Sequence, residues 1–85
     1  NGVEVDFTGE YNALIVVQQD KPGVVAHITK ILSDRGVNIA FMRLFREEKG
    51  HTAYTIVESD ERLPEDVAQL LQENPNIHDV MVVQP

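Results

Sequence analysis

The residues best suited to chemistry lie between Gln18 and Gly23, where an apolar run ends in two amides and an acid and then turns through Lys-Pro-Gly. An acid followed by a proline is typical of a helix start, and the free amides of a first helical turn attract a carboxylate. Gly23 lets a ligand approach the backbone because it has no Cβ. A zwitterionic amino acid suits such a segment, since Asp20 can pair with its ammonium group.

Asn38 offers further polar groups that can help to bind a carboxylate. Within one chain it would lie at the far end of the first predicted helix from Asp20. If two copies align their sheets edge to edge, Asn38 of one copy can face the 18–23 segment of the other. The plainer interpretation is that Asp20 only caps the helix and that Asn38 only begins a strand.

The remaining polar residues indicate no catalytic site. An enzyme of hydrolysis or group transfer needs a nucleophile, a base and an orienting group that converge, and no such motif surrounds His27, His51 or His78. The adjacent acids Glu47 and Glu48 suit a solvated turn. There is no cysteine, so the chain has no thiol nucleophile and no thiolate ligand for a metal or cluster. We therefore expect no cofactor, no metal and no catalysis within this chain.

Composition excludes several kinds of partner. The chain has 85 residues, enough for one small domain. Fourteen acidic residues against seven Lys and Arg give a net charge of −7, which disfavours nucleic acid. The longest unbroken apolar run, from Ala13 to Val17, is far shorter than the roughly 20 residues of a membrane-spanning helix, so we expect no membrane partner.

Hydrophobic periodicity predicts the elements that position these residues. Period-two patterns predict strands at 3–8, 11–19, 37–46, 51–59 and 77–83, and helical spacing predicts helices at 22–35 and from Pro64 to about 73. The order β-α-β-β-α-β predicts an α+β, ferredoxin-like fold, with a four-stranded antiparallel sheet and two helices on one face. The strand at 3–8 would be a short N-terminal addition.

The predicted strands are apolar on both faces. In the strand at 37–46, alternation puts Ile39, Phe41 and Phe45 on one face and Ala40, Met42 and Leu44 on the other. Helices cover only one face of a ferredoxin-like sheet. We therefore expect the other face to be covered by a second copy, by the N-terminal strand or by a larger parent protein.

Two segments resemble a known family. The run LIVVQQDKPGVV from Leu14 to Val25 and the run RGVNIA from Arg35 to Ala40 resemble ACT domains, the small amino-acid-sensing modules of metabolic enzymes. The resemblance covers about residues 11–84. The chain most resembles the ACT domain of the iron–sulfur-dependent bacterial L-serine dehydratases, in particular that of their beta subunit. Residues 3–10 resemble the segment that precedes the domain in that subunit.

The resemblance implies dimerisation through the sheets and an effector bound near the first loop and the Gly-Val-Asn turn. The serine-binding positions of the related ACT domain of phosphoglycerate dehydrogenase fall here on Gln18, Asp20 and Asn38. Asn38 keeps its residue type, whereas the relative has His and Asn at the other two. The implied ligand-binding set is Gln18, Asp20, Pro22, Gly23, Val24, Val37, Asn38 and Ile39.

The resemblance also implies a role within a larger enzyme. Residues 1–10 would form a lead-in strand and residues 11–85 an ACT domain. This domain would bind L-serine and regulate a cytoplasmic L-serine dehydratase, which converts serine to pyruvate and ammonia in serine catabolism and gluconeogenesis. The 4Fe-4S cluster would belong to the catalytic domain or subunit. The alternatives are a subunit-association domain that binds no effector and, with least support, an autonomous enzyme.

Overall fold

The computed structural model describes residues 12–47 and 51–84. Its elements are β1 (Asn12–Gln19), α1 (Val24–Asp34), β2 (Ile39–Arg46), β3 (Thr52–Ser59), α2 (Val67–Gln72) and β4 (Ile77–Val83). This order confirms the β-α-β-β-α-β prediction. The N-terminal strand predicted at 3–8 lies outside the described residues.

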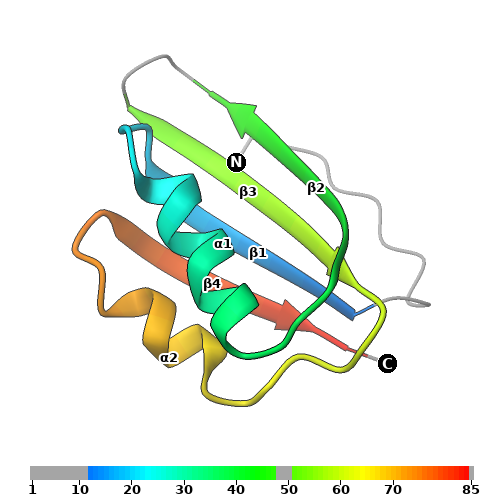
Figure 1. Ribbon diagram of the computed structural model, residues 1–85. Coiled ribbons are helices and arrows are strands. Elements are labelled where there is room, and N and C mark those ends of the chain that lie inside the picture. The colour runs from blue at the N-terminus through cyan, green and yellow to red at the C-terminus, as the bar shows by residue number, and fades with distance from the viewer. Residues whose placement is uncertain (1–11, 48–50, 85) are drawn as a thin grey trace.

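The four strands form one antiparallel sheet in the order β2-β3-β1-β4, so β1 and β3 are central and β2 and β4 are the edges. Both helices lie over the same face of the sheet (Figure 1). The ferredoxin-like prediction is therefore confirmed. Neither helix in the described ranges is long and apolar enough to cross a membrane.

The core lies between the sheet and the two helices. Alternation along β1 turns Leu14 and Val16 toward the helices, and their partner strand β3 adds Val57. The apolar stripe of α1 recurs every fourth residue and is fully buried, at Val24, Ile28 and Leu32. On α2, Val67 and Leu71 complete the cluster.

Glycine determines both ends of α1. At the C-terminal end, Gly36 has φ 75°, and the amide of Val37 donates to the carbonyl of Leu32 at 2.9 Å, as in a left-handed helix stop. At the N-terminal end, Gly23 is the N-cap with φ 88°. The predicted start at residue 22 is wrong, because a residue in the left-handed region cannot belong to a right-handed helix.

The second helix also begins later than its proline predicted. Residues 65 and 66 form a turn, in which the amide of Val67 donates to the carbonyl of Pro64 at 3.3 Å, and α2 then runs from Val67. Pro64 starts this turn rather than the helix. A bond between residues three apart closes a tighter turn than an α-helix allows.

A β-bulge in β2 changes which residues share a face. Ile39 pairs with Ser59 and Phe41 with Glu58, so the register shifts between them. Ile39 packs against the core on the helix side, whereas Phe41 lies on the other face, 48% exposed. The prediction that these two residues share a face is wrong, because strict alternation holds only without a bulge.

Strand β2 is largely exposed on both faces. Met42 and Leu44 pair with Val57 and Thr55 and therefore face the helix side, yet they are 41% and 44% exposed. On the opposite side of the sheet Met81 of β4 is 55% exposed. The expectation that a second copy, the N-terminal strand or a parent protein covers the sheet stays a prediction.

Truncation of a core residue should destabilise the fold strongly. Leu32→Ala removes a fully buried side chain at the centre of the α1 stripe and should lower the free energy of unfolding by about 2–5 kcal/mol. Met81→Ala is the control, because its side chain is 55% exposed and should cost less than about 1 kcal/mol. Urea denaturation followed by circular dichroism measures both; equal losses would contradict this core.

Candidate functional site

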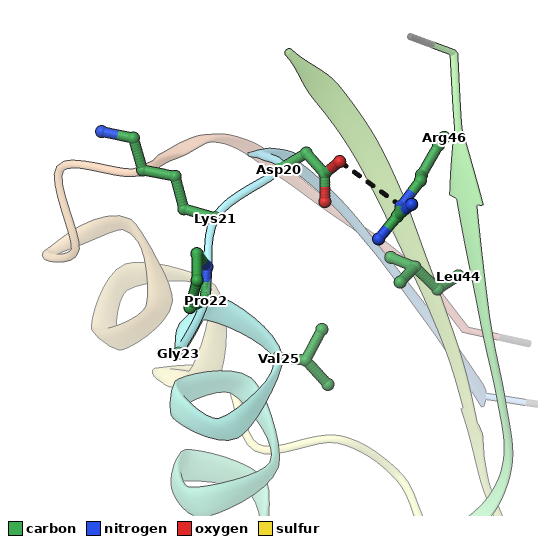
Figure 2. Close-up of a pocket in the computed structure, with 7 residues that line it drawn as sticks. All are labelled: Asp20, Lys21, Pro22, Gly23, Val25, Leu44 and Arg46. Carbon is green, nitrogen blue, oxygen red and sulfur yellow. Dashed lines mark ion pairs between the residues drawn. The ribbon is translucent and has the colours of Figure 1, made fainter. Parts of the chain in front are cut away.

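A pocket of about 420 Å³ opens between the start of α1 and the end of β2. Figure 2 shows its lining: Asp20, Lys21, Pro22, Gly23 and Val25 from the β1–α1 segment and Leu44 and Arg46 from β2. Three of the predicted ligand-binding residues, Asp20, Pro22 and Gly23, are thus brought together. Val25 and Leu44 give it an apolar side, and Asp20 and Arg46 give it a charged one.

Backbone hydrogen bonds hold the β1–α1 segment at this position. The amide of Gln19 donates to the carbonyl of Asn76 at 2.7 Å, and the amide of Asp20 donates to the carbonyl of His51 at 2.7 Å. These bonds tie the end of β1 to the segments that precede β4 and β3. Asp20 is therefore presented from a fixed backbone rather than from a free loop.

Gly23 shapes the turn that leads into α1. Its φ of 88° is one that other residues adopt only with strain, and a Cβ added there would meet no atom within 4 Å. The open space lies at the pocket, so the backbone is accessible at this point. Because Gly23 is the N-cap, the interpretation of Asp20 as the capping residue is wrong.

The carboxylate of Asp20 pairs instead with Arg46. Arg46 Nε lies 3.3 Å from Asp20 Oδ2, and the side chain of Asp20 is only 15% exposed against 53% for Arg46. The pair joins the end of β1 to the end of β2 across the pocket (Figure 2).

Arg46 is a site residue that the sequence interpretation missed. A signal was present, because β1 and β2 each pair antiparallel to β3 and so run parallel to each other. The last residues of parallel strands lie at the same end of the sheet. A cation at the end of the second strand should therefore lie near an acid that follows the first.

Three predicted ligand-binding residues lie in the core and not in the lining of the pocket. Gln18 is 2% exposed, and its Oε1 accepts a hydrogen bond from Thr55 Oγ1 at 2.7 Å. Val24 and Val37 are buried, at 1% and 8% exposure. Gln18 and Val24 adjoin the Gln18–Gly23 segment from the core side, whereas Val37 lies at the other end of α1.

Asn38 lies at the other end of α1 from the pocket. Its Nδ2 donates to Asp60 Oδ2 at 3.3 Å, and its backbone amide donates to Glu61 Oε1 at 2.9 Å. The 11 residues of α1 separate it from Gly23 by about 16 Å at 1.5 Å per residue. One chain alone therefore does not bring Val37, Asn38 and Ile39 to the pocket.

The described residues bring together no group of three His, Cys, Asp or Glu side chains that could hold a metal ion.

The fold and site define a class: a ferredoxin-like α+β module with a small pocket, apolar on one side and charged on the other, at its first β–α turn. The family model of the ACT domain matches residues 12–76. The chain belongs to the ACT domain family, whose members are regulatory amino-acid-binding modules.

Individual relatives are of several kinds. The chain is 36% identical over 83 residues to a D-3-phosphoglycerate dehydrogenase of Methanocaldococcus jannaschii, covering 98% of this chain and 16% of the relative. It is 30% identical over 77 residues to a probable L-serine dehydratase beta chain of Bacillus subtilis, covering 91% of this chain and 35% of the relative. The chain therefore spans a small part of the curated relatives that it matches.

A solved structure has the same fold. The ACT domain from the GTP pyrophosphokinase of Chlorobium tepidum superposes with a TM-score of 0.68 at 15% identity, covering 88% of this chain and 86% of the other. At this identity the likeness concerns the fold alone.

Next to Arg46, the end of the β2–β3 hairpin holds a hydrogen-bonded tyrosine. Tyr54 Oη donates to Glu47 Oε1, and this bond, with the nearby carboxylate charge, raises the pKa of Tyr54 above its ordinary value of 10.0. The bond favours the protonated phenol in the folded state. Its stabilising effect is therefore present below pH 10.0 and lost as the pH rises through the higher folded pKa.

Removal of the Glu47 carboxylate should reverse this shift. Glu47→Gln should lower the pKa of Tyr54 toward 10.0, because the amide carries no charge to oppose the phenolate. In a Tyr11→Phe background Tyr54 is the one tyrosine left, so the absorbance of the phenolate against pH reports its titration. Glu58→Gln, on the same strand as Tyr54, is the control; an unchanged midpoint in Glu47→Gln would contradict the assignment.

Proposed function

We propose that this chain is the regulatory module of an L-serine dehydratase, and that it dimerises and binds L-serine in the pocket beside Asp20. The observation that carries the proposal is the pairing of an acid and a guanidinium across a small pocket at the turn where the family resemblance implies an effector. A zwitterion needs both charges. The volume of about 420 Å³ suits a small molecule.

The position of β2 supports the dimer. It is an edge strand with exposed apolar residues, and unpaired edges readily accept a second strand. Asn38 and Arg46 lie four residues on either side of Met42. Antiparallel pairing of two β2 strands about Met42 would bring the start of one β2, which follows Asn38, to the end of the other at Arg46.

Such a pairing would complete the implied ligand-binding set. The pocket of one copy would supply Asp20, Pro22 and Gly23, and the second copy would supply Asn38 with its neighbours Val37 and Ile39. The two ends of α1 that are apart within a chain would then meet between chains. This geometry is the reason to expect the ligand at a subunit interface.

The relatives support a larger parent enzyme. We take residues 1–10 as a lead-in and residues 11–85 as the domain, joined to the catalytic part of a cytoplasmic dehydratase that consumes serine and feeds gluconeogenesis. This chain contains no cysteine and does not fit a 4Fe-4S cluster, so the cluster's thiolate ligands would have to come from outside it. The identity of 36% to a phosphoglycerate dehydrogenase favours that enzyme as the alternative parent.

Calorimetric titration tests the effector. L-serine should bind the 85-residue chain, and Asp20→Ala should weaken it about 10- to 100-fold, because a hydrogen bond to a charged group contributes roughly 1.5–3 kcal/mol. Asn38→Ala should also weaken binding. Asp34→Ala is the control, since Asp34 is an exposed acid of α1 that pairs with Lys30 away from the pocket.

A thermal shift gives an independent readout. Serine at 100 times its dissociation constant should add about 2.7 kcal/mol of stability to the wild-type chain. A chain that dimerises but gives neither heat nor a shift with any amino acid would be a structural association domain. If the wild type and Asp20→Ala bound L-serine equally well, the ligand would have to bind outside this pocket.

Matched methionines test the dimer interface. Light scattering should give about twice the chain mass of 9.6 kDa. Met42→Lys should return the 9.6 kDa species, because like charges would meet where the two β2 strands pair, whereas Met81→Lys on the β4 edge should stay dimeric. The reverse pattern would place the interface on the sheet face opposite the helices, and a wild-type monomer would rule out both.

A further inference from the structure

Basic residues occur at this pocket although the chain is acidic. The net charge of the whole chain is −7, yet two of its seven basic residues, Lys21 and Arg46, are among the lining residues, against one acid, Asp20. A basic side chain at a pocket attracts an anionic group even when the molecule as a whole is acidic.

The cation that faces the pocket is Arg46. Figure 2 shows the side chain of Lys21 directed away from Asp20 and Arg46, whereas the guanidinium of Arg46 lies beside the carboxylate of Asp20 and above Leu44. Arg46 extends from β2, where it pairs in register with Ala53 of β3. A strand within a ladder holds this side chain at a more defined position than a loop would.

The ion pair leaves the guanidinium accessible. The separation of 3.3 Å is longer than the roughly 2.7–2.9 Å of a tight charge-assisted hydrogen bond. Arg46 is 53% exposed, whereas Asp20 is 15% exposed. A carboxylate can therefore approach Arg46 from solvent while Asp20 stays in place, and a guanidinium has five donors with which to bind two anionic groups at once.

We infer that Arg46 binds the carboxylate of the effector, and that the pair of Arg46 and Asp20 selects α-amino acids over amines that lack a carboxylate. The inference rests on the proposed function and names the residue that sets its specificity. An α-amino acid carries its ammonium and carboxylate on adjacent carbons. The neighbouring charges of Asp20 and Arg46 present the complementary arrangement.

The test compares two ligands on the wild type and three variants. L-serinamide keeps the ammonium and hydroxyl groups of L-serine but has no carboxylate. The wild type should bind L-serine at least about tenfold more tightly than L-serinamide, because a hydrogen bond between two charged groups is lost. Arg46→Gln should weaken L-serine about 10- to 100-fold and bring the ratio of the two affinities close to one.

Arg43→Gln is the matched control. Arg43 lies on the same strand three residues away, so it faces the opposite side of the sheet, where its guanidinium stands 4.3 Å from the ring centre of Phe45. The Arg43→Gln substitution removes the same charge from the chain as Arg46→Gln but leaves the pocket unchanged. Both ligands should bind it as they bind the wild type.

The ratio separates a binding role from a structural one. If Arg46→Gln lost its fold, the binding of both ligands would weaken together, so its circular dichroism is compared with that of the wild type. Arg46→Lys keeps the charge and should recover part of the discrimination between the two ligands. A wild type that binds L-serine and L-serinamide equally, or an Arg46→Gln protein that keeps the wild-type ratio, would overturn this inference alone. A wild type that binds neither would instead overturn the proposed function.

Discussion

The position of β1 at the centre of the sheet is the constraint on which the rest of the structure depends. The strand is hydrogen-bonded along both edges, to β3 and to β4, and Leu14, Val16 and Gln18 on its helix-facing side are buried. Leu14 and Val16 become the floor of the core. The strand also has a defined end, because the amides of Gln19 and Asp20 are bonded to the segments that precede the neighbouring strands.

The same constraint creates the site. With β1 and β4 beneath the helices, β2 is left at the edge, parallel to β1 and exposed on its helix side. The ends of β1 and β2 meet at one edge of the sheet, where the turn through Gly23 leaves space beside α1. The pocket is thus a consequence of incomplete helix cover, and its charged pair joins the two strand ends that border the uncovered strip.

Much of this could be predicted from the sequence, because the signals were periodic. Apolar residues of both parities in β1 indicated a strand with two apolar faces, the four-residue stripe indicated α1, and Gly36 ended α1 as expected. The bulge in β2 could not be predicted from alternation, because one extra residue puts Ile39 and Phe41 on opposite faces of the sheet. Gly23 also had two possible roles, as the first turn of a helix or as the left-handed residue before it.

The site was predictable only where it is local in sequence. Asp20, Pro22 and Gly23 follow one another, so their proximity needs no fold. Arg46 lies near them only because β1 and β2 both pair with β3. Gln18 is close to Asp20 in sequence, but its side chain points into the core and not into the pocket. Family resemblance could name Gln18 as a ligand-binding position, but alternation along the strand directs its side chain to Thr55.

The dual position of β2 has a thermodynamic consequence for the proposed regulation. Leu44 and Arg46 line the pocket and also belong to the free edge, so a second strand paired there would change the surroundings of the same side chains that meet the effector. Binding and association would then be linked, and the linkage is reciprocal: an effector that favours the paired edge by a given factor is itself bound more tightly by that factor when the edge is paired. An effector held between Arg46 and Asn38 of a second copy needs no long pathway through the fold to act on assembly. In this proposal, the strand that binds the effector is also the strand that pairs.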